Sequence, residues 1–153
     1  MKSLAHEHDK AEILRRLRAL RPDSPRRWGR MSVHQMVCHL ADSFLVCLGK
    51  MPVTMKDLWI RRTALKWVAL YLPLSWPPGI PTTPEIDQVR GGGTAPADFA
   101  KDVARVEGLM ESFSAPTTRF EDGRHPLFGK MSHAAWLRWG YLHLDHHLRQ
   151  FGV

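Results

Sequence analysis

The residues with the clearest capacity for chemistry are three histidines, one in the first third of the chain and two near its end. His143 and His147 are four residues apart in a segment with helical periodicity, so they lie one above the other on one helical face. One helix can offer two imidazoles to a single metal ion in this way. Catalytic sites usually have three protein ligands plus water, so we expect a third ligand from a neighbouring helix.

His39 is the best candidate for this third ligand. It lies within an almost wholly apolar helical segment, where an imidazole without a partner would be costly. Together these residues predict a divalent metal site formed by His39, His143 and His147. Helical histidines are also often hydrogen-bonded core residues, and spacing alone leaves that alternative open.

Helical geometry indicates which histidines of the last helix face the same side and which one faces away. At about 100° per residue, His147 lies about 80° and His143 about 120° from the centre of the apolar stripe, on the same side. His146 points away from the stripe, so we expect it to face solvent or to lie behind the ligands. Gly140 lies on the ligand side and is expected to leave room beside them. The stripe consists of Leu137, Tyr141, Leu144, Leu148 and Phe151.

Asp42 is the candidate for a catalytic role. It follows His39 by three residues on the same side of the helix, so it could orient that histidine or act as a general base. A solvent-facing carboxylate is the alternative interpretation. Gln35 and Gln150 are further candidates for orienting ligands. The expected walls of the pocket are Met36, Trp136 and the loop at 73–96.

Helical periodicity predicts the elements that must position these side chains. The segments 4–20, 32–49, 99–113 and 133–150 predict an all-α four-helix bundle in a single domain over residues 1–153. A helix at 55–72 and the Pro/Gly-rich loop at 73–96 would form an insertion between bundle helices two and three. Such a long loop is either mobile or functional, for example as a lid.

Residues at the helix starts support these boundaries. Asp98 and Ser132 are expected N-caps, and Ser32 has capping-box spacing to Gln35. His34, close to the start of its helix, is expected to be exposed. Two further histidines, His125 and His133, are expected to line the mouth of the pocket that holds the metal.

The net charge of +7 is unevenly distributed. Residues 1–30 carry nine Lys or Arg against four Asp or Glu, and residues 50–66 carry five against one. A basic half could bind nucleic acid, but no DNA-reading helix pattern or aromatic-interleaved basic motif accompanies the charge. We prefer to interpret the positive charge as a cationic face in contact with solvent. A third interpretation, between these two, is that the charge serves to bind a small anionic substrate.

Other features concern compartment and assembly. No apolar run has the form of a signal peptide or the length of a membrane span, which predicts a cytoplasmic protein without membrane association. Cys38 and Cys47 are nine residues apart in one predicted helix, too far for a disulfide, and are expected to be ordinary buried cysteines. Tryptophans in 55–72 could pack a homodimer or the interior of one chain equally well.

Two motifs resemble a known superfamily. The first is WGRMSVHQMVCHLADS at residues 28–43; the second begins with HPLFGKMS at 125–132 and continues through Trp136 to 143–151. Together they resemble the DinB-like superfamily of four-helix metalloenzymes, and in particular a bacterial branch of unknown function. The resemblance spans nearly the whole chain and is weakest at 50–97.

The resemblance implies a zinc, nickel or iron ion held by one histidine of the second helix and a His-x-x-x-His pair of the last. Those residues are His39, His143 and His147 here. Relatives include thiol-dependent transferases and a maleylpyruvate isomerase, which implies a small-molecule substrate and a low-molecular-weight thiol partner. We therefore expect a transferase-, isomerase- or hydrolase-like metal-dependent enzyme that activates a thiol or water. The alternative is a non-catalytic metal-binding or stress-response module.

Overall fold

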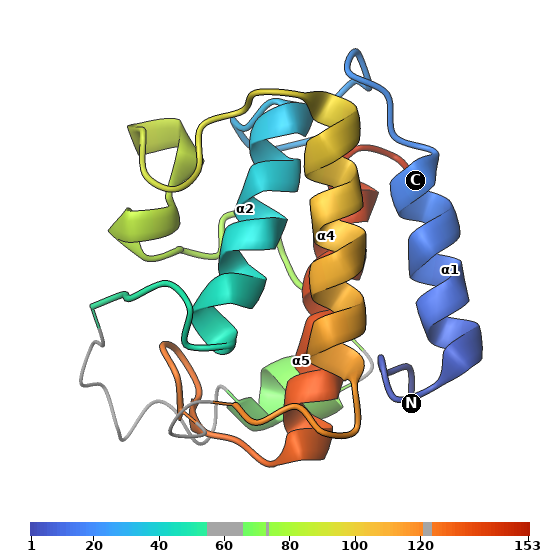
Figure 1. Cartoon of the computed structure of the whole chain (residues 1–153), viewed down its shortest axis with the longest axis vertical. Helices are drawn as coiled ribbons and strands as arrows, with labels where there is room; N and C mark the ends of the chain where they lie inside the picture. The colour runs from blue at the N-terminus through green and yellow to red at the C-terminus, as the bar shows by residue number, and fades with distance from the viewer. Residues whose placement is uncertain (55–65, 73, 121–123) are drawn as a thin grey trace.

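The computed structural model describes residues 1–54, 66–72, 74–120 and 124–153 (Figure 1). This part of the chain is mostly helical, so the predicted all-α class is confirmed. Residues 66–71 are also helical. The long helices are α1 (Glu7–Arg18), α2 (Val33–Cys47), α4 (Phe99–Ser114) and α5 (His133–Gln150). The short elements are η1 (Pro84–Ile86), η2 (Gln88–Arg90), β1 (Arg124–His125) and β2 (Gly129–Lys130).

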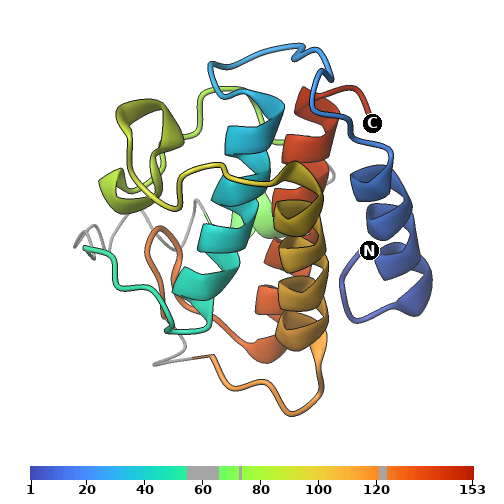
Figure 2. The same cartoon turned by 45° about the horizontal axis from the view of Figure 1, so that its top comes forward.

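The four long helices lie side by side. α2 packs along α4, and α1 packs along α5 (Figures 1 and 2). α5 also contacts α2 and α4, so α2 and α5, the helices that carry His39, His143 and His147, are direct neighbours. The 3-10 turns η1 and η2 pack against α2 from the side away from α1. The segment between α2 and α4 therefore covers part of the helix that carries His39.

Side-chain caps fix the start of three helices. Ser32 Oγ accepts a hydrogen bond from Gln35 N at 3.1 Å, and Gln35 Oε1 accepts one from Ser32 N at 2.9 Å. This is the predicted capping box, which satisfies two amides of the first turn of α2. Asp98 and Ser132 cap α4 and α5 through a single side-chain oxygen, which accepts a hydrogen bond from Lys101 N and from Ala135 N respectively, so the predicted caps are confirmed.

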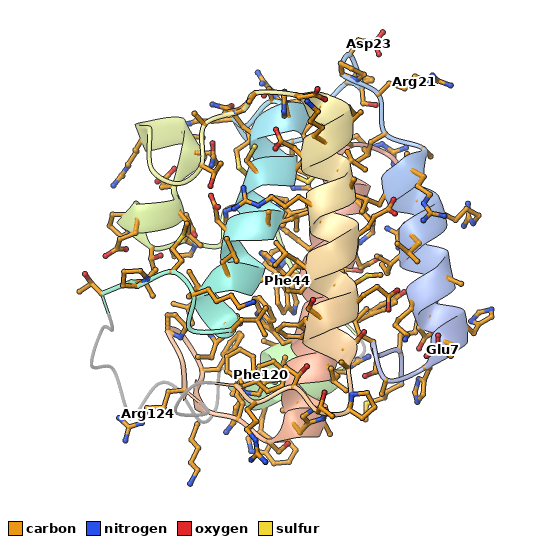
Figure 3. The ribbon with its side chains drawn as sticks, viewed as in Figure 1. Glu7, Arg21, Asp23, Phe44, Phe120 and Arg124 are labelled. Atoms are coloured by element: carbon orange, nitrogen blue, oxygen red, sulfur yellow. The ribbon has the colours of Figure 1, made fainter. Side chains whose placement is uncertain are left out.

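One apolar core joins the four helices. Each of them contributes fully buried side chains, among them Ile13, Phe44, Phe113 and Leu144. Phe44 lies between α2 and α4 in Figure 3, whereas the labelled charged residues lie at the periphery. The apolar stripe expected on α5 is buried throughout. Burial of this stripe fixes the rotation of α5 and therefore the direction of its histidines.

Gly140 has different neighbours from those predicted. A Cβ atom added there would lie 2.8 Å from Leu4 Cδ1 and 2.9 Å from Phe113 Cε1. The glycine therefore faces the core, and the prediction that it leaves room beside the histidines is wrong. The reason is that the segment before α1 and the helix α4 both pack closely onto this side of α5.

Gly140→Ala should therefore destabilise the protein. The methyl group would over-pack the core, which typically costs about 1–3 kcal/mol and exceeds the gain in helix propensity of about 1 kcal/mol. Gly108→Ala on α4 is the matched control, because nothing lies within 4 Å of its added Cβ atom. Urea unfolding should show a lower free energy of unfolding for Gly140→Ala and a higher one for Gly108→Ala. Equal increases in both variants would contradict the packing argument.

The connecting segments differ from the sequence expectations in two places. The segment expected to be irregular contains η1 and η2, and β1 pairs with β2 in antiparallel register, with Arg124 opposite Lys130. Two-residue strands are too short to produce an alternating pattern of apolar and polar residues, so they could not be predicted from periodicity. Of the helix predicted at 55–72, residues 55–65 lie outside the described residues.

Two further expectations concern the cysteines and the membrane. Cys38 and Cys47 are both buried and free, as predicted. Among the described helices, none has the length and apolar character needed to span a lipid bilayer.

Candidate metal centre

Three histidines from two helices converge where α2 meets α5. His39 comes from α2, and His143 and His147 come from successive turns of α5. One ring nitrogen of each lies within 4.8 Å of those of the other two, and this group could hold a metal ion. The ring centroids are 4.8–5.4 Å apart, and all three side chains are buried. The structure thus brings together the three residues selected from the sequence; their role as ligands stays a prediction.

Burial keeps these imidazoles neutral at physiological pH. It lowers the pKa of His39 below its ordinary value, and it lowers the pKa of His143 and His147 well below it. The neighbouring imidazoles act in the same direction on His143 and His147. Because only a neutral imidazole has a lone pair for a metal, all three rings are in the state that coordination requires.

The tautomer of His147 is set by Gln150. The Gln150 Nε2 amide donates to the carbonyl of Trp28 at 2.9 Å, which directs Oε1 toward His147 Nδ1 at 3.0 Å. His147 Nδ1 must therefore carry the proton and donate it, which leaves the Nε2 lone pair free. The expectation that Gln150 orients a ligand agrees with this contact.

His39 is oriented in the same manner by a backbone carbonyl. Its Nδ1 atom donates to the carbonyl oxygen of Ile86 in η1 at 3.1 Å. A carbonyl only accepts, so the proton is on Nδ1 and the lone pair is on Nε2. Two of the three histidines thus have the donor arrangement seen in metal-binding histidines, in which the second ring nitrogen is held by a hydrogen bond.

His143 supplies the strongest indication that the group accommodates an ion. Its ring stacks on Trp139 with centroids 4.8 Å apart and an interplanar angle of 14°. Its buried Nδ1 atom has no hydrogen-bond partner among the described residues. A buried polar atom without a hydrogen-bond partner lowers the stability of the folded protein by about 1–3 kcal/mol. A bond between this imidazole and a metal ion would offset that loss, so the residues present fit a metal.

Asp42 is fully buried, so the solvent-facing alternative is wrong. Its carboxylate accepts hydrogen bonds from Thr94 N and Thr94 Oγ1, both at 2.7 Å, and from Gln88 Nε2 at 3.3 Å. These contacts fasten the loop that contains η1 and η2, and this loop presents the Ile86 carbonyl to His39. Asp42 is not among the residues that line the cavity beside the histidines. Its position therefore favours an orienting role, exerted through the loop, over that of a general base.

Two glycines permit the close approaches that hold these orienting groups. Gly93 has φ +79°, and a Cβ atom there would lie 2.4 Å from Asp42 Oδ2. Gly29 has φ +80°, and a Cβ atom there would lie 2.4 Å from Gln150 Nε2. Both positions combine a left-handed backbone with contact to a polar side chain, which only glycine accommodates without strain. This accounts for one glycine of the 91–93 triplet and for the glycine that follows Trp28.

A cavity of about 500 Å³ opens beside the three histidines. Its lining includes Trp28, Trp76, Trp139 and residues 79–83 and 86–90 of the connecting loop. The loop was expected as a wall, but Met36 and Trp136 do not line the cavity and are buried in the core instead. Trp139 could have been found from the sequence, because it precedes His143 by four residues and so shares its helical face. Trp28 and Trp76 lie on connecting segments, where no helical or strand periodicity indicates the direction in which a side chain points, so their place in the cavity could not be predicted.

The other histidines divide between cavity and surface. His146 is buried, lines the cavity and packs between Trp28 and Trp76, each about 6.1 Å away. The solvent-facing option for His146 is therefore wrong, because these two tryptophans cover the side of α5 opposite its apolar stripe. His125 lines the cavity as expected, whereas His133 is exposed and does not.

His125 should make the fold sensitive to acid. Its Nδ1 atom accepts a hydrogen bond from Leu127 N at 3.0 Å, and burial lowers its pKa to about 3. In the unfolded chain His125 binds a proton below about pH 6.5, whereas in the folded chain it stays neutral down to about pH 3. The free energy of unfolding is therefore at its full value above about pH 6.5 and decreases as the pH falls below it. Between pH 7 and 5, His125 alone should remove about 2 kcal/mol from the free energy of unfolding.

Urea unfolding at both pH values, with a chelator present, measures this loss. In His125→Asn the side-chain oxygen can take over the role of the accepting nitrogen without titrating. The acid-dependent loss should be smaller than in the wild type by about 2 kcal/mol. The same loss in both proteins would rule out His125 as its source.

Comparison with known proteins adds one finding to this geometry. No curated protein and no solved structure matches the chain. A family model matches it over residues 1–152, and the description of that model is protein of unknown function (DUF1569). Because that match covers both histidine helices and the loop between them, the chain belongs to the DUF1569 family.

Proposed function

We propose that this protein is a metal-dependent enzyme that holds one divalent ion through His39, His143 and His147. The observation that carries the proposal is the meeting of three buried, neutral imidazoles from two helices beside a cavity. When bound, such an ion would lower the pKa of a coordinated water or thiol, because three neutral ligands leave its charge uncompensated. Zinc, nickel and iron all accept imidazole ligands.

The surrounding residues support this role by holding the ligands in place. Gln150 and the Ile86 carbonyl fix which nitrogen of His147 and His39 carries the proton. Trp139 fixes the plane of His143 by stacking. The group contains three ligands among the described residues, which is the number typical of catalytic sites with an open position. A structural ion usually has four protein ligands, so this observation favours catalysis over the non-catalytic module.

The cavity favours a small substrate with an apolar part and a negative charge. Its walls near the histidines are the indole rings of Trp28, Trp76 and Trp139. Arg30 and Arg90 also line it, and the acidic residue among the described lining is Asp87. A low-molecular-weight thiol with a carboxylate, or an organic acid, has this combination of properties. The reaction would then be thiol transfer, isomerisation or hydrolysis.

The arrangement of the long helices supports a relation to the DinB-like superfamily. We infer that α1, α2, α4 and α5 correspond to a four-helix bundle of that kind, with the segment between α2 and α4 as an insertion. The support is the side-by-side packing of the four helices and the origin of the histidines from the second and last of them. A crystal structure of the metal-loaded protein would test both the bundle and the ligand set.

Metal analysis tests the proposed function directly. Protein purified without a histidine tag should contain about one divalent ion per chain bound to the three histidines. Addition of azide or a small thiol to the cobalt(II)-loaded Cys38→Ala variant, in which the three histidines are the intact metal-ligating group among the described residues, should change its visible absorption, because an open position accepts an external ligand. A metal content that does not fall when all three histidines are substituted would contradict the site. A visible spectrum that no added ligand changes would favour the structural alternative.

A further inference from the structure

A second group of metal-ligating side chains lies on a different face of α2. His34 and Cys38 are four residues apart on this helix, the same spacing as His143 and His147 on α5. Asp102, in the first turn of α4, completes the group. One ligand atom of each residue lies within 4.8 Å of those of the other two. Cys38 precedes His39 directly, so the two side chains point about 100° apart around the helix and belong to separate groups.

The distances are close to those of a tetrahedral site. Cys38 Sγ lies 3.8 Å from Asp102 Oδ2, and His34 Nε2 lies 2.7 Å from the same oxygen. Standard zinc bond lengths separate sulfur and oxygen ligands by about 3.5 Å, and nitrogen and oxygen ligands by about 3.3 Å. The sulfur–oxygen pair is wider than this spacing by only about 0.3 Å. The nitrogen–oxygen pair needs to open by about half an ångström, which a small side-chain rotation provides.

The donor types indicate which ion the group would take. A thiolate and a carboxylate together carry two negative charges, which balance a divalent cation, and the imidazole is neutral. Thiolate excludes the hard ions Mg²⁺ and Ca²⁺, whereas sulfur, nitrogen and oxygen ligands together are typical of zinc. This group thus differs from the three histidines, which leave the charge of an ion uncompensated.

The group is also accessible to an ion. The side chains of His34 and Asp102 are 23% and 15% exposed, whereas Cys38 lies behind them in the interior. His34 is therefore only partly exposed, and it packs edge-on against Phe99 at the start of α4. Asp102 also accepts a hydrogen bond from Ala97 N at 3.3 Å, which holds its carboxylate in place.

We propose that His34, Cys38 and Asp102 form a second metal site, selective for Zn²⁺ and ions of similar preference, with its fourth position open to solvent. On binding, the thiol proton passes to solvent and the proton on His34 Nε2 is replaced by one on Nδ1. The ion would then join α2 to α4. This site goes beyond the proposed function, because it contains none of the three histidines and does not line their cavity.

Cobalt(II) titration in the absence of added thiol tests this site. A thiolate bound to cobalt(II) absorbs strongly in the near ultraviolet, and the three histidines contain no sulfur. The chain has two cysteines, so Cys47→Ala is a matched control for Cys38→Ala. We expect this absorption in the wild type and in Cys47→Ala, and its loss in Cys38→Ala. Circular dichroism confirms that each variant is folded.

Two further variants make the result decisive. Asp102→Asn should raise the cobalt concentration needed for half of the absorption change by about tenfold or more, and this variant keeps the thiol. His143→Ala should keep the absorption, so a failure of the three-histidine site is distinguishable from a failure of this one. Absence of the near-ultraviolet band at saturating cobalt in the wild type, or its persistence in Cys38→Ala, would overturn the proposal.

Discussion

His143→Ala and His147→Ala should each lower the affinity of the three-histidine site for zinc by more than about 100-fold. Loss of a partner that merely orients a ligand already costs about 10- to 100-fold, and loss of the ligand itself must exceed that. A competition titration against a chromophoric chelator measures this affinity. The Cys38→Ala background restricts the titration to the three histidines. His8→Ala is the control, because the His8 side chain is 89% exposed and should leave the affinity unchanged.

A second variant separates loss of a ligand from loss of the fold. His143→Phe retains an aromatic ring for stacking on Trp139 and removes the buried nitrogen that has no partner among the described residues. It should therefore abolish binding while keeping the metal-free free energy of unfolding at or above that of the wild type. Wild-type affinity in either alanine variant would exclude that histidine as a ligand.

Asp42→Ala should have the largest effect on stability among the polar substitutions near the site. It would leave three buried or partly buried donors of Thr94 and Gln88 without their acceptor. Each donor left without its acceptor costs about 1–3 kcal/mol, so the loss of all three should lower the free energy of unfolding by about 3 kcal/mol or more. The loop that carries Ile86 would also be released from α2, so zinc affinity should fall by about tenfold through His39.

Chemical denaturation and the same chelator titration measure these two effects. Asp42→Asn keeps one accepting oxygen and should give intermediate values for both. Asp23→Ala, at an exposed position, is the matched control for removal of a carboxylate. If Asp42→Ala lowered stability but left zinc affinity unchanged, the loop would not be what orients His39.

The parts of the site that the sequence predicted are those set by local geometry. The pair His143 and His147 follows from helical spacing, and the burial of the α5 stripe fixes its direction. Ser32, Asp98 and Ser132 could be recognised because a capping interaction spans only a few residues. Gln150 lies three residues after His147 on the same helix, so the hydrogen bond between their side chains could also be predicted from helical spacing.

The parts that the sequence did not predict depend on contacts between distant segments. His146 is buried only because Trp28 and Trp76 arrive from two connecting segments. Asp42 and Thr94 are 52 residues apart, and helical spacing contains no information about such a pair. The tight environment of Gly140 depends likewise on Leu4 and Phe113, which reach it from elsewhere in the chain.

The hydrogen bonds that orient the ligands also determine when the protein can acquire its ion. The Trp28 carbonyl that positions Gln150 is 122 residues away in the chain, and the Ile86 carbonyl that holds His39 is 47 residues away. Neither partner is in place before the tertiary structure has formed, so an unfolded or nascent chain has only weakly binding, freely rotating imidazoles. Metal acquisition is therefore expected to follow folding. Free metal would then act on the folded state, raising its stability in proportion to the logarithm of the metal concentration once the site is saturated.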